Sequence, residues 1–361
     1  MNSRITISLF LFVALASTSA CQFSLSKLVP SPVQRAEAAK TGSPSMVRDR
    51  EYLIYQGQVR EHFVQKDYAW LDQEAYNNRT KKLRLPGAYW KLRVFYGAFE
   101  GAMMAQANET DWQWTIAQLT DWTKVRPQSV TAKVALATAW QDYAWKARGN
   151  GFASSVTNDG WETFNERQRI AANILAEASS LNERCPHWYV TALWIGTAQG
   201  WDRDAFEKVF QAGITLEPTY YYIYTAKAAY LMPRWHGEEG EWERFAEASA
   251  LGPEGEVTYF AIYSLMLEFT GVDLMNDHQQ AAPKLIASFH TIERLYGPSI
   301  SRTNEAALYA SFTNDPATTV ELFNRIGNDA DPGVWRSKQT FEAFRQAAQQ
   351  RMQAAGATTK N

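Results

Sequence analysis

Glycine–tryptophan pairs recur at nearly equal intervals along the middle of the chain. The tryptophans of Gly160-Trp161, Gly200-Trp201 and Gly240-Glu241-Trp242 lie 40 and 41 residues apart. Each pair follows one apolar segment and opens the next. Glycine can take the backbone angles of a tight turn between helices, and tryptophan can pack into the seam beside it. The residues of the structural turns predicted in this way are Gly160, Trp161, Gly200, Trp201, Gly240 and Trp242.

The segments between these turns have the apolar spacing of helices. Thr131–Ala147, for example, repeats apolar residues at intervals of three and four. Runs of alternating β-branched residues bounded by hairpin dipeptides, which would indicate strands, are absent. Pro186 and Pro218 mark two helix starts, 32 residues apart, close to the 34-residue period of tetratricopeptide repeats. We therefore expect an all-α chain, an α-α superhelix of stacked helix pairs with a concave inner face.

Three segments carry a resemblance to known proteins: "WKARGNGFASSVTNDGW", "TAQGWDRDAF" and "YLMPRWHGEEGEWERFA". At these residues the chain resembles the tetratricopeptide-like helical-repeat superfamily. More narrowly, over about Ser129–Gly252 it resembles an uncharacterised tryptophan-rich bacterial family, a domain of unknown function. The resemblance implies a solenoid of helix pairs, and it implies no activity. The repeats here are uneven in length, and few positions match the tetratricopeptide consensus.

The bulk composition is that of a folded protein. Hydrophobic residues make up 46% of the 361 residues, and charged residues 20%. The net charge is -2, from 36 basic and 38 acidic residues, and no basic cluster indicates a nucleic-acid partner. No glycine-rich phosphate loop, serine elbow or Cys-x-x-Cys motif is present, so we predict no cofactor. The 14 tryptophans suit either a core or a binding surface.

The first residues have the pattern of an export signal. Arg4 precedes the apolar run Ile5–Ala16, and small residues lead to Cys21. We expect residues 1–20 to be a signal peptide and Cys21 to carry a lipid that anchors the protein in the bacterial envelope. Thr18 stands where lipoprotein signals usually have leucine. The alternative is ordinary cleavage before Cys21, which would give a soluble periplasmic or secreted protein.

The other expected boundaries follow from composition. Residues 21–46 are rich in Ser, Pro, Ala and Gly and are predicted to be a flexible tether. Residues 47–355 form the helical-repeat domain, and residues 356–361 form a tail. Cys185 is the second cysteine of the chain. Lipidation of Cys21 would leave Cys185 as a lone thiol, and a Cys21–Cys185 disulfide is the competing arrangement.

Two long connections favour a binding patch. Lys146–Gly160 and Met232–Gly240 follow successive apolar helices and should lie at the same end of them. Arginine and tryptophan together are typical of interaction hot spots. The patch predicted from the two connections comprises Arg148, Asn158, Arg234, Trp235 and His236. A neighbouring helix face with Tyr220, Tyr224 and Lys227 would line the concave groove, or pack in the core.

Other chemistry is less well supported by the residues. A metal site at His236 with Glu238, Glu239 and Glu241 lacks the second histidine of a zinc-binding helix, so no metal is predicted. A nucleophile pair formed by Cys185 and His187 is also disfavoured. The two residues lie two positions apart at a helix start, so their side chains would point in different directions. The expected function is therefore that of an envelope-anchored, non-catalytic scaffold that presents its surface to a protein or peptide partner. The alternatives are a polysaccharide or peptidoglycan hydrolase with paired carboxylates, or a small-ligand or glycan-binding module.

Overall fold

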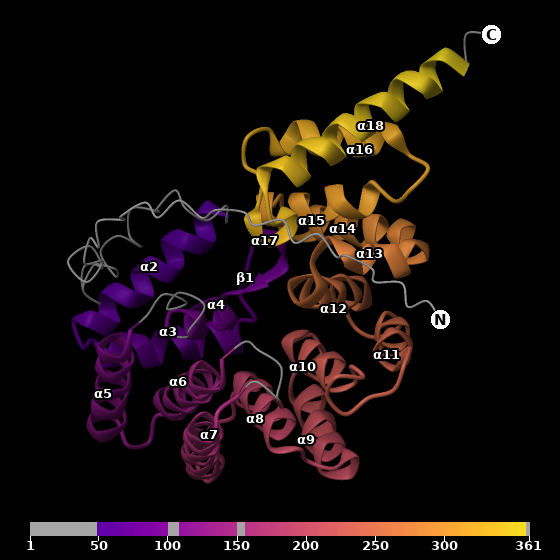
Figure 1. Cartoon of the computed structure of the whole chain (residues 1–361). Helices are drawn as coiled ribbons and strands as arrows, with labels where there is room; N and C mark the ends of the chain where they lie inside the picture. The colour runs from indigo at the N-terminus through magenta and orange to yellow at the C-terminus, as the bar shows by residue number, and fades with distance from the viewer. Residues whose placement is uncertain (1–48, 100–107, 150–155, 359–361) are drawn as a thin grey trace, which may run out of the picture.

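The computed structural model describes residues 49–99, 108–149 and 156–358, which form an array of packed helices (Figure 1). The predicted all-α helical-repeat class is confirmed. The helices are α2 (Arg50–Val64), α3 (Tyr68–Thr80), α4 (Lys91–Gly97), α5 (Glu109–Val125), α6 (Val130–Arg148), α7 (Asn158–Ser179), α8 (Pro186–Gln199), α9 (Arg203–Leu216), α10 (Tyr222–Tyr230), α11 (Glu241–Ser249), α12 (Gly255–Thr270), α13 (Leu274–Asp277), α14 (Ala282–Tyr296), α15 (Ile300–Ala310), α16 (Pro316–Ile326), α17 (Pro332–Trp335) and α18 (Lys338–Thr358). Short 3-10 helices η4 (Gly271–Asp273) and η5 (Gln279–Ala281) join α12 to α14.

Side chains at the helix starts explain where the helices begin. Ser129 accepts a hydrogen bond from the Ala132 N–H at the start of α6, and Asp202 accepts one from the Ala205 N–H at the start of α9. Such caps satisfy backbone donors that have no partner within the helix. α8 opens with Pro186, whose fixed φ suits the first helical turn.

The geometry of the turn between α8 and α9 explains why Gly200 and Trp201 occupy it. Gly200 ends α8 in the left-handed conformation with φ +68°. The Trp201 N–H donates to the Gly196 carbonyl at 2.9 Å, and the Trp201 ring lies on Gly196. Gly240 likewise has φ +73°, immediately before α11.

Gly160 differs from the expected turn residue. It is the third residue of α7, with Thr157 as the capping residue, and its φ is not positive. Its lack of a side chain matters for another reason, because a Cβ there would lie 3.3 Å from the Ala147 carbonyl oxygen of α6. Trp161 therefore sits in the first turn of α7 rather than in a turn between helices.

A small β-hairpin interrupts the helical array, and the sequence did not predict it. Strand β1 (Arg84–Leu85) pairs antiparallel with β2 (Tyr89–Trp90) through the 3-10 turn η2 (Pro86–Ala88). Strands of two residues are too short to produce an alternating pattern. Gly87 has φ +74°, and a Cβ there would lie 2.6 Å from Ser299 Cβ.

The hairpin joins the first described helices of the chain to the turns before α10 and after α14, so that the array from α2 to α14 is closed rather than open. The Gly87 N–H donates to the Gly297 carbonyl at 3.2 Å, after α14. The Trp90 indole N–H donates to the Thr219 carbonyl at 3.1 Å, before α10. Figure 1 shows β1 between α4 and α12 accordingly.

The hairpin that closes the array also determines the surroundings of Tyr220. The sequence left this ring either on a groove-lining face with Tyr224 and Lys227 or in the core, and in the structure it is fully buried. Its centroid lies 4.9 Å from that of Trp90, edge to face, and its hydroxyl pairs with His187 Nδ1 at 3.1 Å. Tyr220 is a core residue because the hairpin occupies the inner side of the array at this point.

A buried arginine holds the closure together. The Arg302 guanidinium donates to the Gly87 carbonyl at 3.3 Å and to the Glu305 carboxylate at 3.0 Å. It also lies 4.5 Å from the centroid of the Tyr89 ring. A buried charge of this kind is tolerated because an opposite charge and hydrogen-bond partners accompany it.

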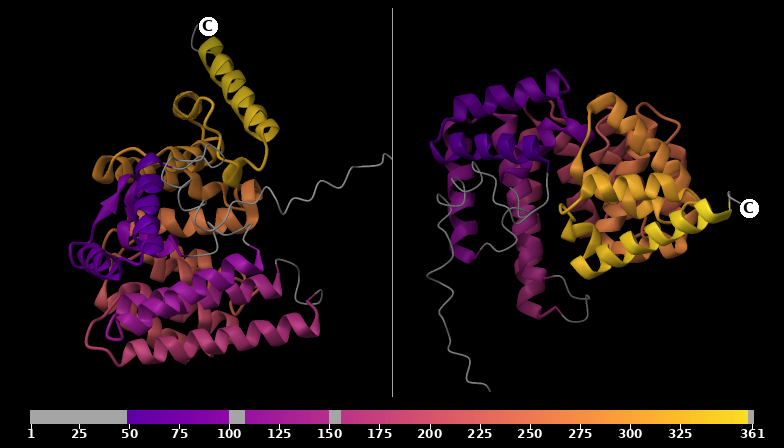
Figure 2. Two further views of the ribbon diagram at one scale, coloured as in Figure 1. Left: turned by 90° about the vertical axis from the view of Figure 1, so that its left-hand side faces the viewer. Right: turned by 90° about the horizontal axis from the view of Figure 1, so that it is seen from above.

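Helix α18 projects from the rest of the molecule (Figure 2). Its first half packs through Phe341 and Phe344 against Trp335, whereas residues 349–356 are exposed. The helix continues to Thr358, through the first part of the expected tail.

The expected signal peptide, Cys21 and tether lie outside the described residues. Among the helices that the structure does describe, none combines the length and the apolar character needed to cross a membrane.

Candidate functional site

The end of α6 and the α10–α11 connection meet through a pair of indole rings. Trp145 lies near the end of α6, and Trp235 lies in the connection between α10 and α11. Their ring centroids are 5.6 Å apart with an interplanar angle of 83°. This edge-to-face contact fixes the end of α6 against a connection 90 residues further along the chain, because aromatic pairs in this geometry attract each other.

Two arginines lie on the aromatic rings around this contact. The Arg148 guanidinium lies 5.4 Å from the Trp145 centroid and 5.3 Å from the Trp161 centroid. The Arg234 guanidinium lies 4.4 Å from the Phe269 centroid and 6.0 Å from that of Trp235. Cation–π contacts of this kind hold each positively charged guanidinium in place, and Arg148 Nη1 also donates to the Gly149 carbonyl at 3.2 Å. Burial lowers the pKa of Arg234 from its ordinary value, but an arginine stays charged at neutral pH.

We call this group of side chains the aromatic–arginine cluster. Phe164 contacts two of its tryptophans, with its centroid 5.0 Å from that of Trp145 and 5.7 Å from that of Trp161. The indole N–H of Trp235 is buried and has no acceptor among the described residues. The members of the cluster are Trp145, Arg148, Trp161, Phe164, Arg234, Trp235 and Phe269.

The other members of the predicted patch take different places. His236 Nε2 donates to the Thr197 carbonyl at 3.0 Å, and its ring stacks on Tyr230 at 4.7 Å. His236 therefore fastens the α10–α11 connection to the end of α8. Asn158 is the exposed first residue of α7. The structure thus brings together Arg148, Arg234 and Trp235.

A cleft of about 470 Å³ lies beside the connection, between α9, α10 and α11. Lys227 lines it, donating to Glu207 at 2.7 Å and lying 4.0 Å from the Phe210 centroid. Arg203 and Glu241 form a second ion pair at the cleft, with 2.8 Å between Nη2 and Oε2.

Tyr224 is half-buried rather than free on the surface. Its hydroxyl donates to the Pro218 carbonyl at 3.0 Å, and its ring packs edge to face on Phe210 with 5.6 Å between centroids.

Trp242, expected at a structural turn, is buried at 5% exposure against Tyr263 and His278.

Two carboxylates of the cleft, Glu207 and Glu241, have lowered pKa values. The hydrogen bond from Arg203 lowers the pKa of Glu241 to about 2. Burial alone would raise the pKa of Glu207, but hydrogen bonds from Gln211 and Lys227 outweigh it, and the pKa is lowered. A general acid must carry a proton at the working pH, so these two groups are suited to binding cations rather than to protonating a leaving group.

The described part of the chain contains no assembled site for metal binding or for a nucleophile. No three side chains from His, Cys, Asp and Glu come together there as metal ligands would. Cys185 is buried, with its thiol 3.3 Å from the Tyr96 hydroxyl. The His187 ring is also buried, and it stacks on the Tyr96 ring with 4.4 Å between the centroids.

Part of the site lies in a segment that matches a family model. Residues 56–199 match the model of a family described as a domain of unknown function (DUF4034). The match includes Trp145, Arg148 and Trp161, and the α10–α11 connection lies beyond it. It overlaps the resemblance seen at Ser129–Gly252 over residues 129–199. No curated protein and no solved structure matches the chain.

Some members of the site were not singled out from the sequence. Trp145 stands three residues before Arg148, the spacing at which side chains meet on a helix, so this contact could have been predicted. Phe269 comes from α12, and the cleft combines three helices. No local pattern links such residues.

Proposed function

We propose that the chain is a non-catalytic binding protein that presents the aromatic–arginine cluster and the adjoining cleft to a protein or peptide partner. The observation that carries this proposal is the contact between Trp145 and Trp235. It gathers arginines from two distant parts of the chain on one aromatic platform, before any partner is present.

The chemistry of the cluster suits such a partner. Tryptophan and arginine carry much of the binding energy in protein interfaces, and rigid rings lose little conformational entropy on binding. The guanidinium groups of Arg148 and Arg234 can donate to carboxylates of the partner, and the rings can pack on its apolar side chains. Lys227 and the neighbouring cleft offer a second point of attachment.

We further propose that the protein is exported and held at the bacterial envelope by a lipid on Cys21, with residues 21–46 as a tether. The charged start, the apolar run and the small residues before Cys21 support this location. Metabolic labelling with a fatty-acid analogue should mark the wild-type protein and not the Cys21→Ser variant. An unlabelled wild-type protein would refute lipidation.

The binding proposal is tested by cross-linking in the envelope followed by capture of the protein. Arg234 is exposed, so Arg234→Ala should keep the fold and reduce partner recovery at least tenfold. Adding Trp235→Ala should abolish it. Lys208→Ala, at an exposed position on α9, is the matched control and should recover the partner fully. Equal recovery by wild type and Arg234→Ala would refute a partner at the cluster.

A further inference from the structure

The carboxylate at the α11 side of the cleft is fully occupied by contacts within the chain. The cleft lies between α9, α10 and α11, and α10 packs against both other helices (Figure 1). Arg203 donates to the two oxygens of Glu241 through its two terminal nitrogens. The Glu238 N–H donates to the same carboxylate at 2.9 Å. Glu241 therefore has no oxygen left for another cation of the cleft.

The second ion pair of the cleft is enclosed by aromatic rings. Lys227 Nζ donates to Glu207 at 2.7 Å and lies 4.0 Å from the Phe210 centroid and 4.9 Å from the Phe245 centroid. The other oxygen of Glu207 accepts a hydrogen bond from Gln211 at 2.7 Å. Only 15% of the Lys227 side chain is exposed. Both members of this pair are therefore held by partners within the chain.

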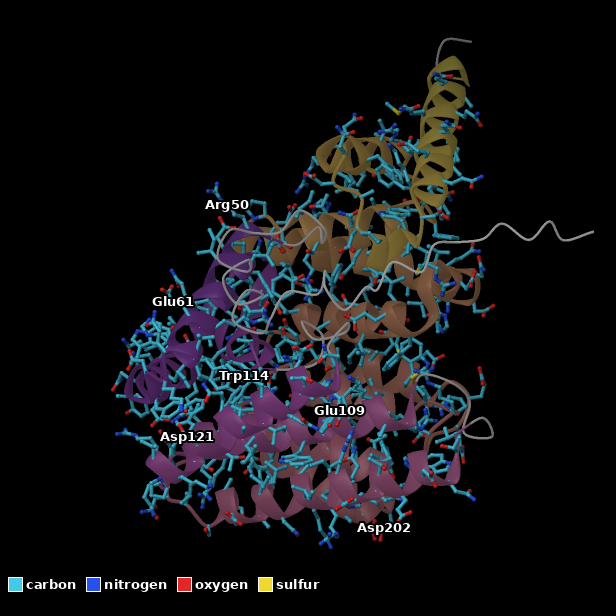
Figure 3. The ribbon with its side chains drawn as sticks, turned by 60° about the vertical axis from the view of Figure 1, so that its left-hand side comes forward. Arg50, Glu61, Glu109, Trp114, Asp121 and Asp202 are labelled. Carbon is cyan, nitrogen blue, oxygen red and sulfur yellow. The ribbon has the colours of Figure 1, made fainter. Side chains whose placement is uncertain are left out.

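One acid that lines the cleft stands outside these pairs. Asp204 lies in the first turn of α9, and within the described residues its side chain makes no hydrogen bond or ion pair. Asp202, which caps the same helix, lies at the surface of the molecule in Figure 3. The Asp204 carboxylate is exposed, so a cation that enters the cleft can reach it.

One base that lines the cleft is also left over. Arg244 on α11 makes no ion pair within the described part of the chain, and its hydrogen bond to the Glu239 carbonyl is long, at 3.5 Å. The hydrogen bond from Arg203 is the largest cause of the lowered pKa of Glu241, and the charge of Arg244 contributes less. Arg244 is exposed, so its guanidinium can donate to an anion in the cleft.

The rest of the lining is apolar or aromatic. Its members are Phe206, Tyr230, Leu231 and Phe245. The Phe206 and Tyr230 rings stack with 3.8 Å between centroids. The Tyr230 hydroxyl donates to the Trp201 carbonyl at 2.9 Å, so this polar atom already has a partner. An occupant of the cleft thus meets an apolar surface and two unpaired charges of opposite sign, on different helices.

The size and the charges of the cleft select one class of ligand. Its volume of about 470 Å³ is in the range of small-ligand sites, roughly 300–1,000 Å³. Covering a charged group is unfavourable unless the group meets an opposite charge or hydrogen-bond partners. A neutral ligand would leave both Asp204 and Arg244 without partners, and a ligand with one charge would leave one of them. A zwitterion with an apolar body can satisfy both.

We infer that the cleft binds a short peptide with a free amino end, a free carboxyl end and apolar side chains. The ammonium group of the peptide donates to Asp204, and its carboxylate accepts from Arg244. Its side chains pack on the apolar lining. The inference rests on the part of the proposed function that makes the cleft a binding site, and it deepens that proposal by naming the ligand.

Calorimetric titration of the Cys21→Ser chain with the dipeptide Leu-Leu tests the inference. Acetylation of the amino end removes the ammonium charge, and amidation of the carboxyl end removes the carboxylate. We expect each blocked dipeptide to bind about fivefold more weakly than Leu-Leu, as for the loss of one solvent-accessible ion pair.

Two variants assign each end of the peptide to its partner. Asp204→Asn should bind Leu-Leu about fivefold more weakly and should bind the acetylated peptide as the parent does. Arg244→Gln should also bind Leu-Leu about fivefold more weakly, but should bind the amidated peptide as the parent does. In each case the interaction is already absent from the blocked peptide, so its partner can be removed without further loss. A general change in structure would weaken all the peptides alike.

The matched control is Lys208→Gln, which removes an exposed charge of α9 outside the cleft lining. It should bind all the peptides like the parent, and every variant should have the parent's circular dichroism. Equal binding of Leu-Leu and its blocked forms would overturn the inference, as would no binding of Leu-Leu by the parent. Variants that weaken every peptide equally would overturn it too.

The inference and the proposed partner at the aromatic–arginine cluster can fail separately. Arg234 does not line the cleft, so Arg234→Ala should bind Leu-Leu like the parent. Peptide binding without any captured partner would reject the cluster as a protein-binding surface and support the cleft ligand. Partner capture that depends on Arg234, without any peptide binding, would reject the cleft ligand and support the cluster.

Discussion

The carboxylate of Asp49 accepts hydrogen bonds from the Ser299 hydroxyl at 2.6 Å and the Ile300 N–H at 2.7 Å, across 250 residues of chain. Asp49→Ala would leave two buried donors without this acceptor, so we expect the free energy of unfolding to fall by about 1–3 kcal/mol. Asp49→Asn keeps an acceptor oxygen and should lose less. Urea denaturation measures both values. Equal losses in the two variants would show that the hydrogen bonds do not stabilise the closure.

The packing of Trp201 on Gly196 can be measured with a double-mutant cycle. A Cβ at residue 196 would lie 2.6 Å from Trp201 Cε3, so Gly196→Ala should lower the free energy of unfolding by about 1–3 kcal/mol. In a Trp201→Ala background the same change should cost much less, because the obstructing ring is gone. Gly356→Ala, with open space around the added Cβ in α18, is the control. Additive effects would refute the contact.

The Arg203–Glu241 pair predicts a pH-dependent stability. Folding lowers the pKa of Glu241 from its ordinary value of 4.5 to about 2. The ionised carboxylate therefore stabilises the fold above pH 4.5, and this contribution is lost as the pH falls toward 2. Glu241→Gln should be less stable than wild type at neutral pH, with the difference disappearing in acid. Thermal unfolding across this range provides the measurement. A difference that does not change with pH would show that the charge is unimportant.

Because Cys185 is buried, we expect its thiol to react slowly with a labelling reagent. In the Cys21→Ser chain, the remaining thiol is 1% exposed and contacts the Tyr96 hydroxyl. A maleimide should therefore label it only as fast as the fold opens, and at once in denaturant. Tyr96→Phe removes the hydroxyl without a large change in shape and serves as the comparison. Rapid labelling of the native chain would contradict the packing described around α8.

The helical architecture could be predicted because its signals are local. The apolar spacing of Thr131–Ala147 indicates a helix, and Gly200 marks a turn through a backbone conformation that other residues avoid. The hairpin at Arg84–Trp90 could not be predicted in the same way. Its strands are stabilised by residues such as Gly297 and Thr219, and nothing near the hairpin in the sequence reports those contacts.

The candidate site was foreseeable in part for the same reason. The two long connections suggested that Arg148, Arg234 and Trp235 share a surface, and the structure brings these three together. The sequence could not show that His236 turns toward the Thr197 carbonyl. Nor could it show that Tyr220 is covered by Trp90, because both positions depend on how distant helices stack.

The contact between Gly87 and Gly297 also limits how many helix pairs fit between the hairpin and the end of α14. In open arrays each unit touches only its neighbours, so units can be added or lost with local effects. Here, an inserted or deleted pair between α5 and α12 would change the arc and pull the hairpin away from the turn after α14. Sequences that adopt this fold should therefore vary in the lengths of connections and keep a constant number of helix pairs between the hairpin and α14.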